Sequence, residues 1–137
     1  MDLTFDTPII FPIHPRIKRH LNYLNSLSSK LHVIKPMGYL EFNYLVERSK
    51  AVITDSGGIT EETTVMNIPC LTLRENTERP ETIQYGTNEL LGTNLDLIRK
   101  AIKKIYSGEW KRGFPPPLWD GKTADRITRH LLSINLK

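Results

Sequence analysis

The sequence predicts an α/β fold in which a parallel sheet is covered by helices on both faces. Short apolar, β-branched runs alternate with helical runs from residue 8 to residue 106, and this alternation is typical of parallel sheets. No internal repeat or linker interrupts it, and 137 residues correspond to one domain by length. We therefore interpret residues 1–137 as a single domain.

The first part of the chain supplies two strands and two helices. Strands are predicted where four to six apolar residues run together, and helices where apolar residues recur every three or four positions. His14 follows the first strand at its carboxyl end, where open α/β sheets bind ligands, although it could simply cap the next helix. Phe42 lies in the second helix, where an aromatic is usually core. The predicted elements are strands at 8–13 and 31–34 and helices at 16–27 and 39–49.

A glycine turn follows the next strand. Residues 51–54 are apolar and β-branched, which suits a strand covered on both faces, and residues 59–66 have the spacing of a helix. Gly57 and Gly58 lie between them. Glycine lets the backbone approach a ligand closely, and the amides of a helix N-terminus point at an anion placed there. The stretch therefore predicts a phosphate-binding turn.

Two carboxylates stand in the first turns of the helix after the glycines. Glu61 and Glu62 are favoured there simply because helix N-termini attract negative charge. Alternatively, one of them turns into the cleft and accepts hydrogen bonds from sugar hydroxyls, as acidic residues do in nucleotide-binding folds. Neighbouring helical residues project about 100° apart, so the two cannot face the same way.

The rest of the chain continues the alternation. Cys70 falls in a buried strand pattern, and Arg79 is held extended before Pro80 at a helix start. Asn94 is a helix N-cap. In the final helix we expect the apolar residues to face inward, namely Ala124, Ile127, Leu131 and Leu132. The predicted elements are strands at 70–73 and 89–93, helices at 82–85, 95–106 and from 123 onward, and a proline-rich loop at 108–117.

Composition excludes several classes of function. The net charge of +4 has no run long enough for a nucleic-acid patch, so we expect no nucleic-acid partner. No apolar run has membrane length and no signal peptide is recognisable, so we expect a cytoplasmic protein without a membrane partner. Cys70 is the only cysteine, which rules out an internal disulfide. We expect no metal and no cofactor.

Six motifs occur together in order. They are Phe11 to Arg16 (FPIHPR), Gly38 to Phe42 (GYLEF), Thr54 to Glu62 (TDSGGITEE), Glu78 to Glu81 (ERPE), Leu91 to Thr93 (LGT) and Asp120 to Ile127 (DGKTADRI). With these motifs the sequence resembles the non-hydrolysing UDP-N-acetylglucosamine 2-epimerase family, over nearly all of its length.

The resemblance implies a Rossmann-like domain, the carboxyl-terminal half of a two-domain GT-B-type fold, which holds the UDP part of the substrate. Ser56, Gly57 and Gly58 would bind the diphosphate, and Glu62 rather than Glu61 would bind the ribose. The other implied contacts are Phe42 against the uridine and His14 and Arg79 near the diphosphate and sugar. The family interconverts UDP-N-acetylglucosamine and UDP-N-acetylmannosamine by eliminating UDP and adding it back, a pathway that serves polysaccharide biosynthesis.

The chain departs from the family pattern by what it lacks. The amino-terminal domain is missing, and with it the carboxylates that move the proton, so no catalytic residue is predicted here by motif. The first strand of the carboxyl-terminal domain is missing too. In the strand order 3-2-1-4-5-6 that strand is central, so two groups of strands would be left unjoined. We expect an isolated chain without activity, completed by a second polypeptide or a second copy of itself.

Two alternatives remain open at this point. The chain could be an inactive fragment that still binds nucleotide sugars. It could also be the nucleotide domain of a GT-B glycosyltransferase, which shares the glycine turn and the acidic helix start but would not be expected to share the motif Glu78 to Glu81.

Overall fold

The chain divides into two compact units, Met1–Leu45 and Val46–Lys137. The computed structural model describes residues 7–14, 23, 24, 26 and 28–134. The strands follow this division, because those described form two separate parallel sheets, one in each unit. No described strand pairs with both sheets.

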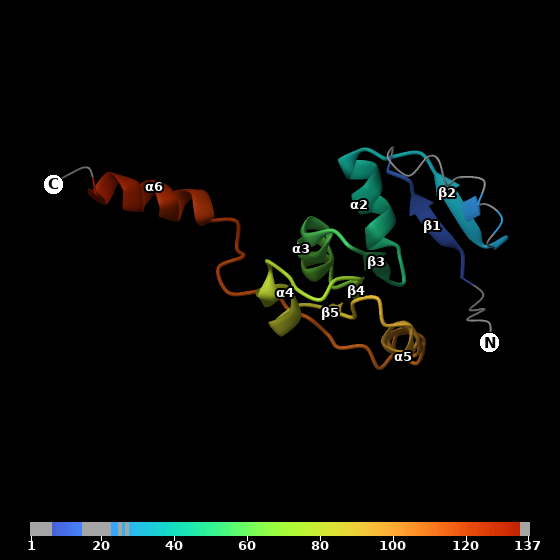
Figure 1. Ribbon diagram of the computed structural model, residues 1–137. Helices are drawn as coiled ribbons and strands as arrows, with labels where there is room; N and C mark the ends of the chain where they lie inside the picture. The colour runs from blue at the N-terminus through green and yellow to red at the C-terminus, as the bar shows by residue number, and fades with distance from the viewer. Residues whose placement is uncertain (1–6, 15–22, 25, 27, 135–137) are drawn as a thin grey trace. The chain divides into compact units, whose positions relative to one another are not determined.

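The first unit is built on β1 (Ile9–Pro12) and β2 (Leu31–Ile34) (Figure 1). The two strands run parallel, with Ile9 opposite Leu31 and Pro12 opposite Ile34. Both strands were predicted from the sequence. Most of the helix predicted at 16–27 lies outside the described residues.

The helix α2 (Tyr39–Glu47) confirms the helix predicted at 39–49, although it ends two residues earlier. Its first turn is held by Gly38, whose N–H donates to Glu41 Oε2 at 3.1 Å. The Gly38 carbonyl accepts the N–H of Phe42 at 2.9 Å. The boundary between the two units falls inside α2.

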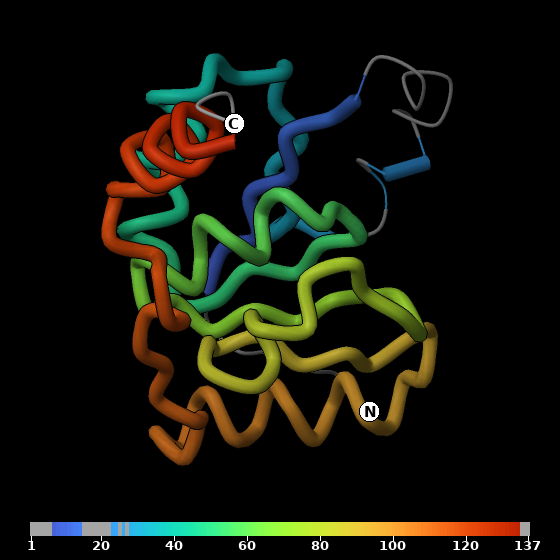
Figure 2. Tube along the Cα trace, turned by 90° about the vertical axis from the view of Figure 1, so that its left-hand side faces the viewer, coloured from blue at the N-terminus to red at the C-terminus, as the bar shows by residue number. Residues whose placement is uncertain are grey.

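The second unit contains the sheet β3-β4-β5, formed by Val52–Thr54, Cys70–Thr72 and Asn88–Leu90. All pairs are parallel. The central strand β4 is buried at every residue. The helices α3 (Gly57–Met66) and α5 (Leu95–Tyr106) lie on opposite faces of this sheet in both views, which confirms the predicted layers (Figures 1 and 2).

An apolar core lies between the sheet and α5. The cluster consists of Leu71, Leu91, Ala101 and Ile105, with Ala51, Ile98, Ile102 and Trp110 packed against it. Asn94 caps α5 as predicted, because its Oδ1 accepts the N–H groups of Asp96 and Leu97. Leu95, the first residue of α5, is exposed.

The opposite face of the sheet packs against threonines of α3. Thr60, Thr63 and Thr64 are almost completely buried. Their hydroxyls donate to carbonyls one turn back on the same helix, for example Thr64 Oγ1 to Thr60 O at 2.8 Å, so their polar atoms are satisfied without partners from the sheet. Cys70 is buried beneath them as predicted, and burial raises the pKa of its thiol.

The open edge of β3 departs from the sequence prediction. Ile53 was expected to be covered on both faces, but its side chain is 51% exposed. In the other unit, Ile9 and Ile10 of β1 are 57% and 42% exposed. An apolar run therefore does not by itself show that a strand is covered on both faces.

The last element also corrects a prediction. The helix α6 (Thr123–Ile134) forms where expected, but none of its residues is buried. Ile127, Leu131 and Leu132 are exposed apolar residues rather than inward-facing ones, and Ala124 is exposed too. Periodicity identifies an apolar face but does not show that the same chain covers it. No helix among the described residues is both long and apolar enough to cross a membrane.

The start of α6 gives a pH-dependent prediction. Arg126 binds Asp120 through two contacts, Nη1 to Oδ1 at 2.8 Å and Nη2 to Oδ2 at 2.5 Å. This pair, with a further hydrogen bond from the Lys122 N–H, lowers the pKa of Asp120 from 3.8 to about 2. A carboxyl with a lowered folded-state pKa stabilises the fold above its unfolded pKa, and that stabilisation is lost as the pH falls through the folded value.

We therefore expect the Asp120 carboxyl carbon to titrate near pH 2 in an NMR titration of the folded chain. Arg126→Met should move that midpoint upward, toward the ordinary value of an aspartate. An unshifted midpoint in the unsubstituted chain would show that the pair does not form in solution.

Candidate functional site

The turn between β3 and α3 is the centre of the candidate site. The helix begins at Gly57, two residues earlier than the sequence indicated, so both glycines belong to its first turn. Ser56 is the N-cap in an extended conformation, with its N–H donated to Thr54 Oγ1 at 3.0 Å. The Ser56 side chain does not cap the helix. The first amides of a helix have no intrahelical partner, so this turn presents N–H groups to a ligand.

Neither glycine of the turn is required by the backbone or by packing. Neither has a positive φ. A Cβ added to Gly58 would meet nothing within 4 Å, and one added to Gly57 would meet only Arg74 Nη1, at 4.0 Å. By contrast, a Cβ on Gly113 would come within 2.8 Å of the Gly86 backbone. The space above the turn is therefore open, as close approach of a ligand requires.

The two carboxylates after the turn share one hollow. Glu61 and Glu62 line it with Val65 and Trp119, and its volume is about 280 Å³. We expected only one of them to face the cleft, but both border the same hollow. Glu61 also accepts a hydrogen bond from Arg79 while it lines the hollow.

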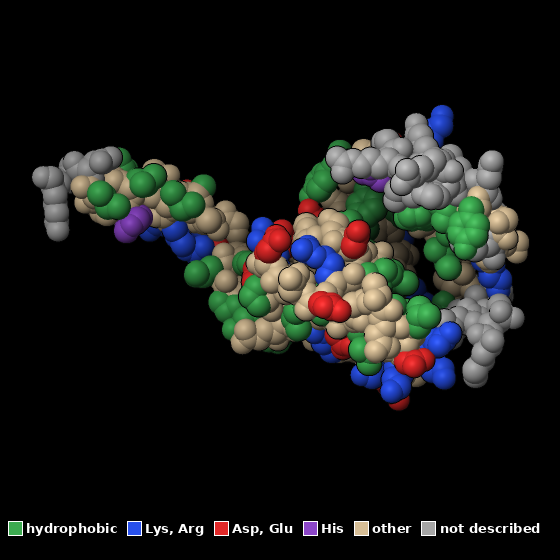
Figure 3. Space-filling view, viewed as in Figure 1, with side chains coloured by type: hydrophobic (Ala, Val, Ile, Leu, Met, Phe, Trp, Pro, Cys, Tyr) green, Lys and Arg blue, Asp and Glu red, His purple; other side chains and the backbone are tan. Residues whose placement is uncertain are grey.

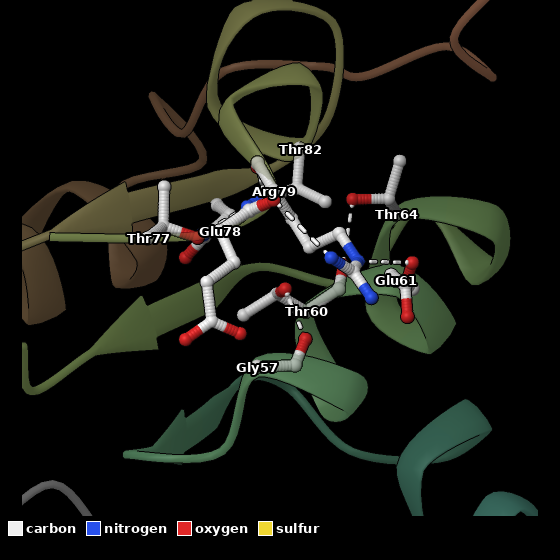
Figure 4. Close-up of polar contacts among 9 residues, drawn as sticks. Gly57, Thr60, Glu61, Thr64, Thr77, Glu78, Arg79 and Thr82 are labelled. Carbon is white, nitrogen blue, oxygen red and sulfur yellow. Dashed lines mark hydrogen bonds and ion pairs between the residues drawn. The ribbon is translucent and has the colours of Figure 1, made fainter.

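Arg79 is held in place by Glu61. Its Nε donates to Glu61 Oε1 at 2.7 Å, and its Nη1 donates to the Glu78 carbonyl at 3.2 Å (Figure 4). The hydrogen bond and the charge of Glu61 raise the pKa of the guanidinium. Arg79 precedes the helix α4 (Pro80–Gln84) as predicted, but its ψ of 63° falls short of the extended range.

A buried polar chain fixes the backbone of Arg79 from beneath. Thr72 Oγ1 donates to Asn88 Oδ1 at 2.6 Å, Asn88 Nδ2 donates to Thr82 Oγ1 at 3.1 Å, and Thr82 Oγ1 donates to the Arg79 carbonyl at 2.7 Å. All three side chains are buried. No sequence pattern indicates this chain of bonds, because its members come from β4, α4 and β5 without a common spacing.

Arg74 is a further residue that the sequence prediction missed. It follows β4 by two positions, and its carbonyl accepts the Gly92 N–H at 3.2 Å. It lines a second hollow of about 440 Å³ at the ends of β4 and β5, together with Leu91 to Asn94. The available signal was its position just past a parallel strand, where ligands bind.

Five of the seven predicted site residues belong to the second unit, namely Ser56, Gly57, Gly58, Glu62 and Arg79. Acidic and basic side chains are interspersed over α3 and α4 on the face shown in Figure 3. His14 is exposed just after β1, and Phe42 is half-buried on α2. Both belong to the first unit, so their part in this site stays a prediction.

The described residues contain no group of three His, Cys, Asp or Glu side chains placed to hold a metal ion. The groups in and around the turn are backbone amides, the Ser56 hydroxyl, the carboxylates of Glu61 and Glu62, and the arginines Arg74 and Arg79. Such a set can bind an anion and the hydroxyls of a sugar.

This fold belongs to the Rossmann-like α/β class, in which ligands commonly bind at the carboxyl ends of parallel strands. Comparison with known proteins narrows the class. A family model described as UDP-N-acetylglucosamine 2-epimerase matches residues 2–132. The chain belongs to the UDP-N-acetylglucosamine 2-epimerase family.

Similar proteins are much longer than this chain. The chain is 43% identical over 132 residues to a UDP-N-acetylglucosamine 2-epimerase of Methanocaldococcus jannaschii. The match covers 93% of this chain but 36% of that protein. It is 41% identical to a UDP-2,3-diacetamido-2,3-dideoxy-D-glucuronate 2-epimerase of Pseudomonas aeruginosa, with 93% and 35% covered. The chain thus spans about a third of the length of these relatives.

Solved structures agree with this match. The Methanocaldococcus jannaschii UDP-GlcNAc 2-epimerase in complex with UDP-GlcNAc and UDP superposes with a TM-score of 0.78 at 41% identity, covering 93% of this chain and 36% of that one. The matched structures are GT-B epimerases, which confirms the α/β fold class predicted from the sequence.

Proposed function

We propose that this chain binds the UDP part of a nucleotide sugar and contributes that half of the site to a UDP-N-acetylglucosamine 2-epimerase. The single observation that carries the proposal is the glycine turn. Gly57 and Gly58 are the first two residues of α3, although neither backbone conformation nor packing requires glycine at these positions. A diphosphate placed there would accept hydrogen bonds from helix amides.

The roles of the other residues follow from their positions. Ser56, whose side chain does not cap the helix, would bind the diphosphate beside the two glycines. Glu62, in the hollow with Trp119, would accept hydrogen bonds from the ribose hydroxyls. In the first unit, Phe42 would stack on the uracil and His14 would lie near the diphosphate.

The proposed reaction eliminates UDP from C1 together with the proton on C2, which leaves a C1–C2 double bond. UDP then adds back at C1 while a proton returns to the opposite face of C2. Negative charge develops on the departing diphosphate, and prepositioned amides and a cation stabilise that charge. This chain would hold the leaving group. The carboxylates that move the proton at C2 would come from the part of the family protein that this chain does not match.

We propose that the choice of sugar also depends on the portion of the family protein that this chain does not match. Relatives named for two different UDP-sugars are 43% and 41% identical to this chain, so identity does not select between the sugars. Both names contain UDP, and this favours recognition of the nucleotide diphosphate by the matched region.

We further propose that another polypeptide, or a second copy of the chain, completes the sheet. Among the described strands, β3 has a neighbour on one side alone and exposes Ile53, and β1 exposes Ile9 and Ile10. An added parallel strand would satisfy such edges and cover their apolar residues. Sedimentation velocity tests this: a purely monomeric chain that unfolds cooperatively on its own would count against the need for a complement.

Isothermal titration calorimetry with UDP tests binding directly. We expect heat of binding with UDP at up to millimolar concentration, and none with a sugar that carries no nucleotide. The absence of heat with UDP would refute the site assignment.

A complementation assay separates an epimerase part from an inactive binding fragment. UDP-N-acetylglucosamine is incubated with this chain alone, with the unmatched portion of the Methanocaldococcus jannaschii relative alone, and with both. Formation of the C2 epimer only in the mixture supports an epimerase part. UDP binding without activity in any mixture supports the fragment that binds without chemistry.

Glu62→Gln is expected to weaken UDP binding about tenfold or more, because a neutral amide is a weaker acceptor for ribose hydroxyls than a carboxylate. The titration that measures UDP affinity measures this change too. Glu109→Gln, an exposed glutamate past the end of α5, is the matched control and should bind UDP normally. Equal affinities for the Glu62 and Glu109 variants would remove Glu62 from the site.

A further inference from the structure

The backbone of Arg79 is held on both sides by threonines. Its N–H donates to Thr77 Oγ1 at 3.0 Å, and its carbonyl accepts the Thr82 hydroxyl at 2.7 Å and the Thr82 N–H at 3.0 Å. Its φ of −129° and ψ of 63° fall outside the ordinary helical and extended regions. The direction in which the Arg79 side chain leaves the backbone is therefore set by these neighbours rather than by regular secondary structure.

Asn88 fixes the direction of the Thr82 hydroxyl. A hydroxyl has one hydrogen to donate. Asn88 Nδ2 donates to Thr82 Oγ1 at 3.1 Å, which uses a lone pair of that oxygen and leaves its hydrogen for the Arg79 carbonyl. At its other end the Asn88 amide accepts the Thr72 hydroxyl at 2.6 Å. The donors and acceptors thus run in one direction, from β4 through β5 to Arg79.

This chain of bonds is buried, whereas the guanidinium that it supports is accessible. Thr82 and Asn88 have no exposed surface, and Thr72 is 2% exposed. Water cannot replace a partner lost there, so each bond is costly to break. The Arg79 side chain is 44% exposed, and its Nε donates to Glu61 Oε1 at 2.7 Å (Figure 4). A rigid support therefore carries a side chain that a ligand can reach.

We propose that Asn88 and Thr82 are positioning residues, which orient Arg79 so that its guanidinium meets the phosphate or sugar groups of a bound UDP-sugar. The proposal rests on the UDP-binding function proposed above and on the place near the diphosphate and sugar that the family resemblance implies for Arg79. Neither positioning residue touches the ligand, because both are fully buried. A guanidinium binds two oxygens at once only when its fork faces them, so misplacing its backbone weakens the ligand.

Thr82→Val in the full chain tests the support directly. Valine has nearly the shape of threonine but lacks the hydroxyl that binds the Arg79 carbonyl. Calorimetry with UDP is expected to show affinity weakened about fivefold or more, the size of effect that one lost buried hydrogen bond produces. Thr82→Ser keeps the hydroxyl and should stay within about twofold of the unsubstituted chain.

Thr87→Val is the matched control. Thr87 is equally buried, and its hydroxyl donates to the Ile68 carbonyl at 2.6 Å. Ile68 precedes β4, whereas Arg79 follows it. The same substitution should therefore lower stability in a thermal melt while UDP affinity stays normal.

Asn88→Asp changes the direction of the bonds without changing the size of the side chain. A carboxylate accepts hydrogen bonds but does not donate them, so the Thr82 hydroxyl would turn toward position 88 and away from Arg79. UDP affinity is expected to fall as in Thr82→Val. A thermal melt shows whether this variant folds with its buried charge, and the Thr82 variants decide the proposal if it does not.

The Nε–H resonance of Arg79 gives a readout that stability alone would not move. Its hydrogen bond to Glu61 should give it a distinct signal in a nitrogen–proton correlation spectrum, identified by its loss in Arg79→Lys. Thr82→Val should shift or broaden this signal in the absence of ligand. Thr82→Ser and Thr87→Val should leave it in place.

The outcomes separate this proposal from the proposed function. If UDP binds the unsubstituted chain and Thr82→Val equally well, the positioning role is refuted while UDP binding stands. Equal losses in Thr82→Val and Thr87→Val also refute it, because affinity then follows stability. If UDP does not bind the unsubstituted chain, UDP recognition is refuted, and the Nε–H signal decides alone: a shift in Thr82→Val but not in Thr87→Val supports the positioning of Arg79, and an unmoved signal refutes it.

Discussion

Gly57→Val is expected to abolish UDP binding, with affinity reduced by about a hundredfold or more, while the second unit stays folded. The valine side chain would occupy the space where a phosphate meets the first amides of α3. The fold should tolerate it, because Gly57 has no positive φ and a Cβ there meets only the end of Arg74, at 4.0 Å. A hundredfold loss corresponds to about 2.7 kcal/mol.

Calorimetry with UDP and a thermal melt of the same sample measure the two effects separately. Gly57→Ala provides an intermediate step, since one methyl group fills less of the turn than valine. UDP binding within threefold of the unsubstituted chain for Gly57→Val would show that the ligand does not approach the backbone at this residue, and the glycine turn would lose its proposed role.

The sheet itself was largely predictable from the sequence. Strands with parallel neighbours on both sides are short and apolar. The apolar run at 70–73 therefore predicted both the position of β4, to within one residue, and its burial. The division of the described strands into two separate sheets was also predictable, because the family resemblance implied two strand groups that are not joined. The exposure of Ile53 was not predictable, because the apolar run alone predicted burial.

The electrostatics of the site were less predictable. The helix phase showed that Glu61 and Glu62 differ, but the partner of Glu61 lies 18 positions further along the chain. That contact depends on where α4 begins, which is fixed by the hydrogen bond from Thr82 to the Arg79 carbonyl. Polar side chains that meet from three elements leave no periodic pattern, so the partners of Arg79 could be identified only in three dimensions.

The apolar face of α6 shows a different limit. Its spacing correctly identified which residues share a face, and a hydrophobic stripe normally packs against the same domain. Here Ile127 and Leu131 stay exposed. Periodicity describes the helix, whereas burial depends on a surface that the pattern does not contain.

Gly86→Ala is expected to destabilise the second unit strongly, by about 3 kcal/mol, in contrast to the glycines of the turn. A Cβ on Gly86 would overlap Thr64 Oγ1 and come within 2.5 Å of the Thr82 carbonyl. The Gly113 backbone packs against the same residue, since a Cβ on Gly113 would lie 2.9 Å from Gly86 Cα. Because these neighbours are mostly backbone or fully buried, they cannot move aside cheaply.

Urea unfolding followed by circular dichroism measures this loss as a lower midpoint at an unchanged slope. Gly58→Ala is the matched control, because a Cβ there meets nothing within 4 Å and should change the free energy of unfolding by less than about 1 kcal/mol. The two substitutions add the same methyl group. At Gly86 it disturbs the fold, whereas at Gly58 it enters the space proposed for the diphosphate. Equal unfolding midpoints would mean that Gly86 does not approach Thr64 and Thr82 this closely in solution.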